Sequence, residues 1–291
     1  MDKRAVDKLI EQTYSSLPPR LQRAARFAID NPKAMALNSM RANAMQTDLP
    51  ASAMHRLART LGFEGYDALR AVYRDWLAQD SSLFTRRATA LQRNRADKAE
   101  NLVREIAQAE SFNLGQITDP ATVQALKTAR DVLSKARFIH VAGLRSLFPA
   151  AFYFNYACNM FMHNTNLLSG VGGTFSDDLR HAGPNDALVI FSYEPYARDA
   201  VAAADYARAQ GMQIVAITDS AVSPVASQAA ALIVVPNATP ALFPSIVPAL
   251  AIAQTLVALL IADGKQASME EIERSESQLR EFSVYLNDAA G

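Results

Sequence analysis

The spacing of apolar positions divides the chain into an all-helical front and a back in which strands and helices alternate. Between Pro18-Pro19 and Pro32, apolar residues recur at helical spacing, and they are Leu21, Ala24, Ala25, Ala28 and Ile29. This pattern predicts an amphipathic helix. Four more helices are expected in the front: around Leu9 and Ile10, over 38–46, from near Pro50 to Leu61, and over 66–78. Gly62 suits the end of the helix that runs from near Pro50 to Leu61.

From residue 137 onward, short apolar runs alternate with helical segments. The runs expected as strands are 138–143, 166–170, 187–192, 213–218 and 231–236. Helices are expected at 147–162, 197–210, 224–229 and 245–262. This alternation predicts a parallel sheet covered by helices on both faces, with right-handed crossovers. The fold class expected is therefore α/β, with an all-α N-terminal domain joined to a doubly wound parallel-sheet domain.

The segments between and after these regions complete the expected organisation. Residues 79–97 are polar and basic and are expected to form a connector, followed by helices over 98–117 and 120–136. The charged amphipathic end of the chain is expected to form an outer helix or a subunit contact. The predicted divisions are 1–77 (all-helical domain), 78–136 (helical linker), 137–265 (parallel-sheet domain) and 266–291 (C-terminal helix).

The charge of the chain is unevenly distributed. The 291 residues have no net formal charge, yet residues 1–76 carry 12 Lys and Arg against 8 Asp and Glu. A modestly basic front favours an anionic partner. The single cysteine, Cys158, lies in an apolar run and is expected to be buried, and one cysteine cannot form an internal disulfide or a Cys-based zinc site. Scattered histidines and the pair Asp177-Asp178 give no expected metal site, and no cofactor is expected.

The ends and the longest apolar run bear on localisation. The N-terminus, MDKRAVDKLIEQ, is charged and lacks the apolar core of a signal peptide. The run IVPALAIAQTLVALLIA is shorter than a typical membrane span and contains Gln254 and Thr255, so a buried helix is expected. These features predict a cytoplasmic protein with no membrane partner.

The stretch SMRANAMQTDLPASAMHRLARTLGF, residues 39–63, has the pattern of a helix-turn-helix. Ala44 is small enough for two helices to pack closely, Thr47-Asp48 supply turn chemistry, and Leu49 is an apolar residue directly after the turn. The second helix has an apolar stripe formed by Met54, Leu57, Ala58 and Leu61. Its opposite face presents Ser52, His55, Arg56 and Arg59. These side chains suit phosphates and base edges in the major groove of DNA, although an ordinary solvated helix face would have the same composition.

Two longer stretches of the front extend this pattern. The run LPPRLQRAARFAIDNP, followed by S-M-x-x-x-A and then by HRLARTLGFEGYDALR, resembles the RpiR-type (RpiR/MurR) bacterial transcription regulators over nearly all of residues 17–77. The resemblance implies a helix-turn-helix domain that binds double-stranded operator DNA. It also implies a C-terminal SIS (sugar isomerase) domain. Because helix-turn-helix dimers read two half-sites, a homodimer or homotetramer is expected. Pro50 departs from the Ser or Thr that usually opens the recognition helix.

The back of the chain also resembles a SIS domain. ARFIHVAGLRS is similar to the opening strand and its G-x-G-x-S turn, with Arg145 at the second glycine, and GMQIVAITDSAVSPVASQAAALIVVP is similar to the later half. Such turns lie at the carboxyl ends of neighbouring strands, where α/β sheets bind ligands. The resemblance implies a small effector, a phosphosugar or a related compound. It is expected to contact Arg145, Ser146, Ser192, Glu194, Arg198, Thr218, Ser220 and Ser223. As an alternative, Ser146, Thr218 and Ser223 can simply cap helices.

The stretch FSYEPYAR, 191–198, departs from the S-x-S-G-x-[ST] phosphate turn of many SIS domains. Ser192 matches the first serine, whereas Glu194, Pro195 and Ala197 remove two hydroxyls and one amide N–H and add a negative charge. Repulsion between a carboxylate and a phosphate about 4 Å apart is on the order of 1 kcal/mol in water. Glu194 can pair with a basic residue, accept hydrogen bonds from sugar hydroxyls or an amine, act as a catalytic base, or point to solvent. The stretch is interpreted as an altered effector-specificity turn.

Two functions fit these patterns. The first is a ligand-responsive transcriptional regulator, and the second is a sugar-phosphate isomerase with an accessory helical domain. Isomerisation needs an acid and a base near the ligand, for which Glu194, His181 and His140 are the candidates. His140 lies within a predicted strand and is expected to be buried, and His181 lies in a polar loop and is expected to be exposed. No acid–base pair emerges, so a regulator without enzymatic activity is expected.

Overall fold

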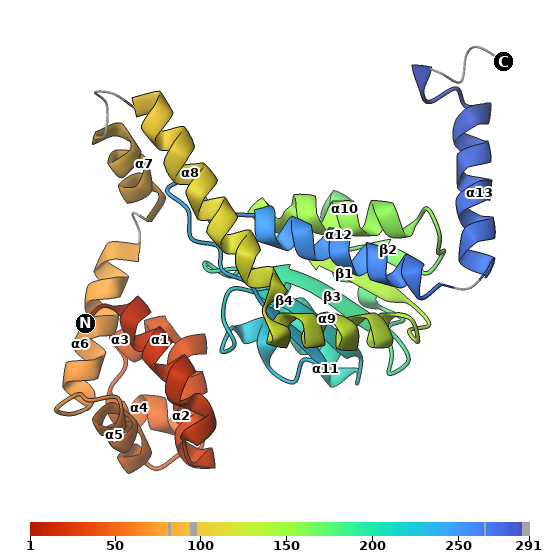
Figure 1. Cartoon of the computed structure of the whole chain (residues 1–291). Coiled ribbons are helices and arrows are strands. Elements are labelled where there is room, and N and C mark those ends of the chain that lie inside the picture. The colour runs from red at the N-terminus through yellow and green to blue at the C-terminus, as the bar shows by residue number, and fades with distance from the viewer. Residues whose placement is uncertain (81–82, 94–97, 265, 287–291) are drawn as a thin grey trace. The chain divides into compact units, whose positions relative to one another are not determined.

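The chain folds into two compact units (Figure 1), as seen in a computed structural model that describes residues 1–80, 83–93, 98–264 and 266–286. One unit comprises Met1–Lys98 with Ser220–Pro224, and the other comprises Ala99–Asp219 with Val225–Gly291. Parts of two predicted segments, 81–82 and 94–97 of the connector and 287–291 of the C-terminal helix, lie outside the described residues, as does 265.

The first unit is all-helical. Its helices are α1 Lys3–Thr13, α2 Pro19–Asp30, α3 Pro32–Leu37, α4 Met40–Gln46, α5 Ala51–Thr60, α6 Tyr66–Asp80 and α7 Leu83–Arg93. Five of them match the predicted helices. The six-residue α3 was not predicted, because it is too short to show a periodic pattern and follows α2 after one residue. Helix α7 lies in the predicted connector, so part of that polar stretch is helical.

The core of the first unit contains an apolar cluster and, beside it, the buried side-chain amide of Asn43. Met54, Leu57 and Ala58 of α5 are fully buried, as predicted from their spacing. Beside them, the Asn43 amide donates hydrogen bonds to the Tyr66 hydroxyl at 2.6 Å and to the Ala34 carbonyl at 3.0 Å. A buried amide must find such partners, so this group fixes how α3, α4 and α6 meet.

The second unit is an α/β domain built on a five-stranded parallel sheet, which confirms the predicted fold class. The strands are β1 Ile139–Gly143, β2 Thr165–Leu167, β3 Ala187–Ser192, β4 Gln213–Thr218 and β5 Ala231–Val234, in the order β2-β1-β3-β4-β5. The prediction of β2 at 166–170 was wrong at its end, because the chain turns at Gly170, which has a left-handed backbone with φ of +66°. The helix predicted over 224–229 was also wrong, since only a 3₁₀ turn, Pro224–Ala226, forms there.

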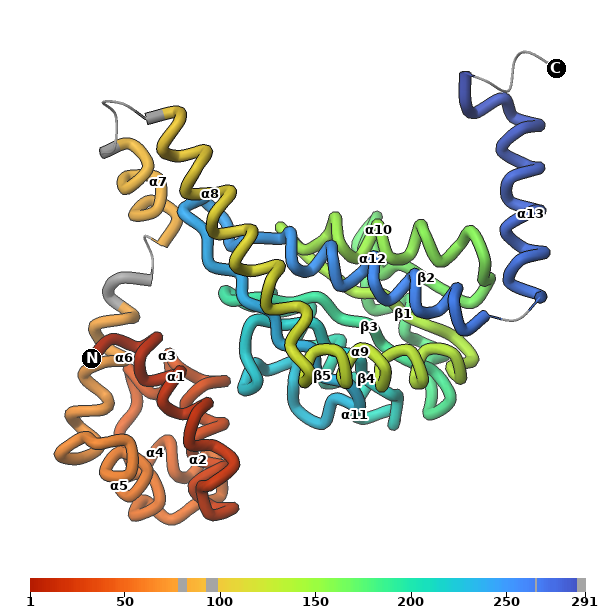
Figure 2. Tube along the Cα trace, in the orientation of Figure 1, coloured from red at the N-terminus to blue at the C-terminus, as the bar shows by residue number. Residues whose placement is uncertain are grey.

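Helices cover both faces of the sheet. Alternate residues of β3 point to opposite sides: Val189 and Phe191 pack with α9 (Pro120–Leu133), α10 (Phe148–Cys158) and α12 (Val247–Ala262). Leu188 and Ile190 pack with α11 (Arg198–Ala209). Figures 1 and 2 show α10 and α12 on one side of the sheet and α11 on the other. Two further helices, α8 (Lys98–Gly115) and α13 (Gln266–Glu281), precede and follow this arrangement.

The apolar run near the C-terminus forms helix α12, in which seven residues are buried. Cys158 is buried as well, as predicted. Among the described residues, no single helix is both long and apolar enough to cross a membrane, and only α12 and α13 taken together, bent by 116°, meet the length and composition test.

Candidate functional site

In the first unit, α4 and α5 are joined by a tight turn. The Leu49 amide donates to the Ala44 carbonyl at 3.0 Å, and the Thr47 hydroxyl donates to the same oxygen at 2.9 Å. Asp48 has a left-handed backbone, with φ of +51°, which Asp tolerates better than most residues. Ala44 and Leu49 are both buried. These contacts close a tight turn between α4 and α5, and the assignment of the pair as a helix-turn-helix stays a prediction.

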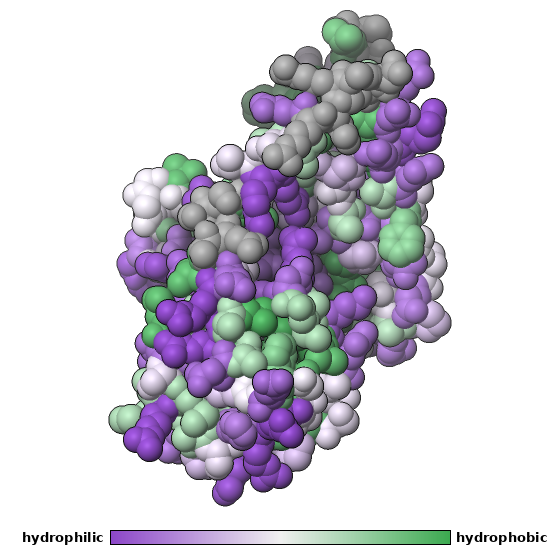
Figure 3. All heavy atoms as spheres, turned by 90° about the vertical axis from the view of Figure 1, so that its left-hand side faces the viewer, coloured by the Kyte–Doolittle hydropathy of each residue, from purple (hydrophilic) through white to green (hydrophobic). Residues whose placement is uncertain are grey.

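Helix α5 has one buried and one exposed face. All four residues predicted to contact DNA are exposed, namely Ser52, His55, Arg56 and Arg59. A Cβ atom on Gly65 would lie 3.2 Å from the His55 ring, so the glycine leaves room for the imidazole. The Arg59 guanidinium donates to the Glu64 carbonyl at 3.2 Å. Figure 3 shows that hydrophilic side chains cover much of the viewed face, which also carries apolar patches.

The start of α5 differs from a side-chain-capped helix. The helix begins at Ala51, and Pro50 occupies the N-cap position, where it makes no side-chain hydrogen bond. Replacement of the usual Ser or Thr therefore leaves the first-turn N–H groups without a side-chain acceptor.

In the second unit, the carboxyl ends of β1, β3 and β4 meet at one edge of the sheet. Ser192 pairs with Thr218 in register, and Gly143 pairs with Phe191. Because β1 lies between β2 and β3, the direction of winding reverses there, and such switch points bind ligands in open α/β sheets. The turn after β1 carries Arg145 and Ser146, and the turn after β3 leads through Glu194 to Arg198 at the start of α11.

The turn after β1 requires glycine-like geometry at two positions. A Cβ on Gly143 would lie 2.6 Å from the Ala151 Cβ and 2.8 Å from the Leu147 carbonyl oxygen, so only glycine fits. Arg145 has φ of +58°, a left-handed backbone that L side chains rarely adopt. This is the position where the resembling family has its second glycine. The Arg145 side chain is exposed, and Ser146 is half-buried.

Asp219 ties the turns after β3 and β4 together. Its Oδ2 accepts a hydrogen bond from the Glu194 amide at 3.2 Å, and its Oδ1 accepts one from the Tyr196 hydroxyl at 3.1 Å. Burial raises the pKa of the Asp219 carboxyl above its ordinary value, and the nearby Glu194 charge also acts to raise it. Asp219 was not predicted as a site residue, although its place directly after the apolar run QIVAIT was a usable signal.

The other predicted effector residues differ in exposure. Ser192 and Thr218 are buried at the strand ends, Glu194 is half-buried, and Arg198 is exposed. Ser220 and Ser223 belong to the segment Ser220–Pro224, which groups with the first unit. Effector contact by all eight predicted residues stays a prediction.

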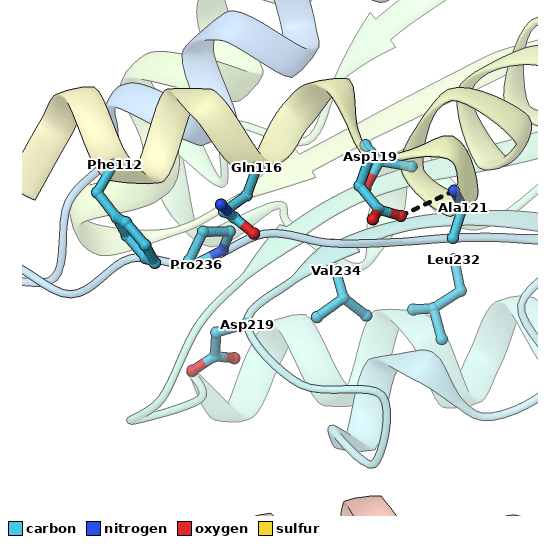
Figure 4. A pocket seen from close by; sticks show the side chains of 9 residues that line it. Phe112, Gln116, Asp119, Ala121, Asp219, Leu232, Val234 and Pro236 are labelled. Carbon is cyan, nitrogen blue, oxygen red and sulfur yellow. Dashed lines mark hydrogen bonds between the residues drawn. The ribbon is translucent and has the colours of Figure 1, made fainter.

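An open pocket of about 500 Å³ adjoins Asp219. Its lining residues are Phe112, Gln116, Asp119, Ala121, Thr122, Asp219, Leu232, Val234 and Pro236. In Figure 4, Phe112 and Gln116 project from the end of α8 and the turn after it toward Pro236, while Leu232 and Val234 lie along β5. The Asp119 carboxylate accepts a hydrogen bond from the Ala121 amide at 2.8 Å and so caps α9. The pocket joins an apolar wall to a small number of polar groups, a composition typical of ligand sites.

Polar groups with unused hydrogen-bonding capacity lie close to this pocket. Burial raises the pKa of the Tyr193 hydroxyl, and the charges of Asp219 and Glu110 also act to raise it. Among the described residues, nothing hydrogen-bonds to this hydroxyl. Glu110 of α8 accepts a hydrogen bond from the Ser245 hydroxyl at 2.5 Å. Sequence reasoning missed Tyr193 and Glu110, because only the tertiary fold brings α8 to the ends of the strands.

Neither candidate histidine, His140 or His181, forms an acid–base pair with Glu194. His140 is buried within β1, and burial lowers the pKa of its imidazole. The exposed His181 offers its backbone carbonyl to Arg137, which also binds Asp186, the residue preceding β3. Glu194 follows the opposite end of that six-residue strand, roughly 20 Å away. In the described part of the chain, no group of three His, Cys, Asp or Glu residues is arranged to hold a metal ion.

Comparisons with known proteins agree with this architecture. A family model for the SIS domain matches residues 132–260. The sugar isomerase domain of an RpiR transcription factor from Sphaerobacter thermophilus is 24% identical, with a TM-score of 0.57, and the match covers 60% of this chain and 98% of that chain. The NanR protein of Vibrio vulnificus, solved in complex with ManNAc-6P, is 15% identical with a TM-score of 0.57, and the match covers 97% of this chain and 99% of that one.

A third similar structure is a protein from Methanococcus jannaschii for which a 3-hexulose-6-phosphate isomerase function was inferred. It is 14% identical with a TM-score of 0.42, and the match covers 59% of this chain and 89% of that chain. The match to the family model and the parallel sheet in the order β2-β1-β3-β4-β5 together identify residues 132–260 as a SIS domain that follows an all-helical N-terminal region.

Proposed function

We propose that this protein is a DNA-binding transcriptional regulator whose SIS domain binds a small-molecule effector. The observation that carries the proposal is the exposed face of α5, which presents His55, Arg56 and Arg59 opposite a fully buried apolar stripe. Arginine binds phosphates and guanine edges, and a helix that follows a tight turn is the element that enters the major groove.

The SIS domain supplies the regulatory input. The candidate edge after β1, β3 and β4 joins hydroxyls, two arginines and carboxylates next to an open pocket. NanR, whose fold is similar, was solved with a sugar phosphate, which supports a small carbohydrate derivative as the class of ligand. A ligand changes DNA affinity only if it binds two arrangements of the protein with different affinity. The protein acts as a homodimer or homotetramer, because operator half-sites are read in pairs.

The double variant R56A/R59A tests the proposal. We expect it to weaken retention of the protein on its own upstream DNA at least about thirtyfold in a gel shift, since each arginine contributes about 1–3 kcal/mol. Binding by the wild type should fall steeply between two salt concentrations, because phosphate contacts release counterions.

A matched control is R74A, which removes an exposed arginine from α6. It should bind DNA nearly as well as the wild type, and circular dichroism should show that all three proteins fold alike. Unchanged binding by R56A/R59A would remove α5 as the recognition helix, and a wild type that binds no genomic fragment would overturn the proposed function.

A further inference from the structure

We infer that the pocket beside Asp219 binds an effector that carries hydroxyl or amino groups and no phosphate. The inference rests on the proposed function, in which the SIS domain senses a small molecule, and it specifies the chemistry of that molecule. It follows from the donors, charges and apolar surface around the pocket.

Four backbone positions around this pocket offer no free N–H group to a phosphate. The start of α9 borders the pocket, but Pro120 has no N–H and the Ala121 amide is bound by the Asp119 carboxylate. In the turn after β3, the Glu194 amide is bound by Asp219 and Pro195 has no N–H. An anion in this pocket would therefore meet few free backbone donors.

The charge of the pocket has the wrong sign for a phosphate. Its nine lining residues include two aspartates, Asp119 and Asp219, and no lysine or arginine. The arginines of the neighbouring turns, Arg145 and Arg198, are exposed and do not line it. One carboxylate about 4 Å from a phosphate weakens binding roughly fivefold in water, and more strongly in a drier pocket.

The same groups suit hydroxyls and amines. Carboxylate oxygens accept hydrogen bonds from both, and the Gln116 amide can donate and accept. The Thr122 side chain, which also lines the pocket, adds a hydroxyl that can donate and accept. Phe112, which is 64% exposed, and Val234, which is 39% exposed, offer apolar surface for the carbon skeleton of a ring. A sugar or amino sugar without phosphate matches this set.

Labelling of a cysteine placed in the pocket tests its charge preference without knowledge of the effector. In full-length Q116C, the rate of labelling is measured with cationic aminoethyl methanethiosulfonate and with anionic sulfonatoethyl methanethiosulfonate, each divided by the rate for free mercaptoethanol. The native Cys158 does not interfere, since it is buried and burial raises the pKa of its thiol to about 12. We expect the cationic reagent to be favoured by about fivefold or more.

Two variants and one control site complete this experiment. In the Q116C background, D219N and E194Q should each reduce the preference several-fold, and both keep the size of the side chain they replace. A cysteine at the exposed position of Gln124 on α9 should show little preference. Equal labelling by both reagents at Q116C, or a preference that D219N and E194Q leave unchanged, overturns the inference.

A matched pair of ligands gives a second readout. Glucosamine should protect Q116C from labelling more than glucosamine 6-phosphate does at the same concentration, and equal or stronger protection by the phosphate overturns the inference. Neither readout involves DNA. A charge-selective pocket in a protein that binds no DNA would therefore refute the proposed function alone, and a DNA-binding protein with an unselective pocket would refute this inference alone.

Discussion

The sheet of the SIS domain carries a carboxylate at each of two opposite edges: the buried Asp186 before β3 and the half-buried Asp219 after β4. Asp186 accepts hydrogen bonds from Arg137 Nε at 2.9 Å, from Arg137 Nη2 at 2.8 Å and from the Gly183 amide at 2.8 Å. The hydrogen bonds from Arg137 lower the pKa of the Asp186 carboxyl. Asp219 receives neutral donors instead, and burial raises the pKa of its carboxyl.

The two edges thus differ in how well their polar groups are satisfied. At the amino edge, Asp186 has a cationic partner and uses both oxygens. At the carboxyl edge, Asp219 is desolvated beside a second carboxylate, the Tyr193 hydroxyl has no described partner, and Arg145 has a left-handed backbone. Unfavourable features of this kind gather at functional sites. Asp186 is therefore a carboxylate with a cationic partner, whereas Asp219 has neutral donors only, as the ligand site proposed above requires.

The largest expected effect is at the amino edge. D186N should lower the free energy of unfolding by about 1.5–3 kcal/mol, because it removes charge-assisted hydrogen bonds from Arg137. Urea unfolding followed by circular dichroism measures this loss. D177N is a suitable control, since Asp177 forms an exposed pair with Arg180 at 3.1 Å, and its loss should stay below about 1 kcal/mol. A D186N protein as stable as D177N would break the distinction between the two edges.

The two carboxylates should also respond to pH in opposite directions. The folded-state pKa of Asp186 is lowered, so its contribution is fully present above the unfolded pKa of about 3.9 and is lost as pH falls through the folded value. The folded-state pKa of Asp219 is raised, so its charge costs stability as pH rises through that value.

Melting temperatures measured across pH separate these two contributions. The deficit of D186N relative to the wild type should shrink below about pH 4. D219N, by contrast, should gain stability relative to the wild type as pH rises above about 4, by less than D186N loses. A D219N protein whose relative stability falls over that range would show that Asp219 is a stabilising acid like Asp186.

A smaller effect is expected at Tyr193. Y193F removes a buried hydroxyl that has no described partner, so it should leave stability unchanged or raise it by up to about 1 kcal/mol. The matched control is Y66F in the first unit, where the hydroxyl accepts a hydrogen bond from Asn43 and its loss should cost about 1 kcal/mol. Thermal unfolding measures both variants. If Y193F lowers the free energy of unfolding as much as Y66F does, the Tyr193 hydroxyl has a structural hydrogen-bond partner.

The smallest expected effect is at Arg145. R145G should raise the free energy of unfolding by about 0.5 kcal/mol, because relief of a left-handed backbone outweighs the extra flexibility of glycine in the unfolded chain. Chemical denaturation measures the gain, and R198G, which places glycine in the first turn of α11, should instead destabilise. A loss in R145G would show that the arginine side chain stabilises the turn.

Most helices and strands could be located from the sequence, because burial decides which positions of an element are apolar. Strands β3 and β4 match their predicted ranges, 187–192 and 213–218, since continuous apolar runs are needed where both faces of a strand are covered. β2 is a half-buried edge strand with a mixed pattern, so its position was less well defined. The stretch 224–229 begins with proline and is too short to hold a helix without strong caps.

The site was only partly predictable for a different reason. Ser192 and Thr218 could be placed because strand ends are visible in the sequence. The hydrogen bonds from Glu194 and Tyr196 to Asp219 span 25 and 23 residues and depend on the register between β3 and β4. The approach of Glu110 to Ser245 spans 135 residues. No local sequence pattern encodes such contacts. The sequence therefore predicted repulsion of a phosphate by Glu194 alone and did not show that Asp219 lies beside it.

The hydrogen bonds of Asp219 connect ligand recognition to the position of a helix. A ligand that donates to the Asp219 oxygens shares them with the Glu194 amide and the Tyr196 hydroxyl. Glu194 lies only four residues before Arg198, where α11 begins. If a ligand bound at Asp219 shifts these hydrogen bonds, it also shifts the equilibrium position of the first turn of α11. The two equilibria are then coupled, so a change in the turn alters the ligand's affinity by the same factor as the ligand alters the equilibrium of the turn.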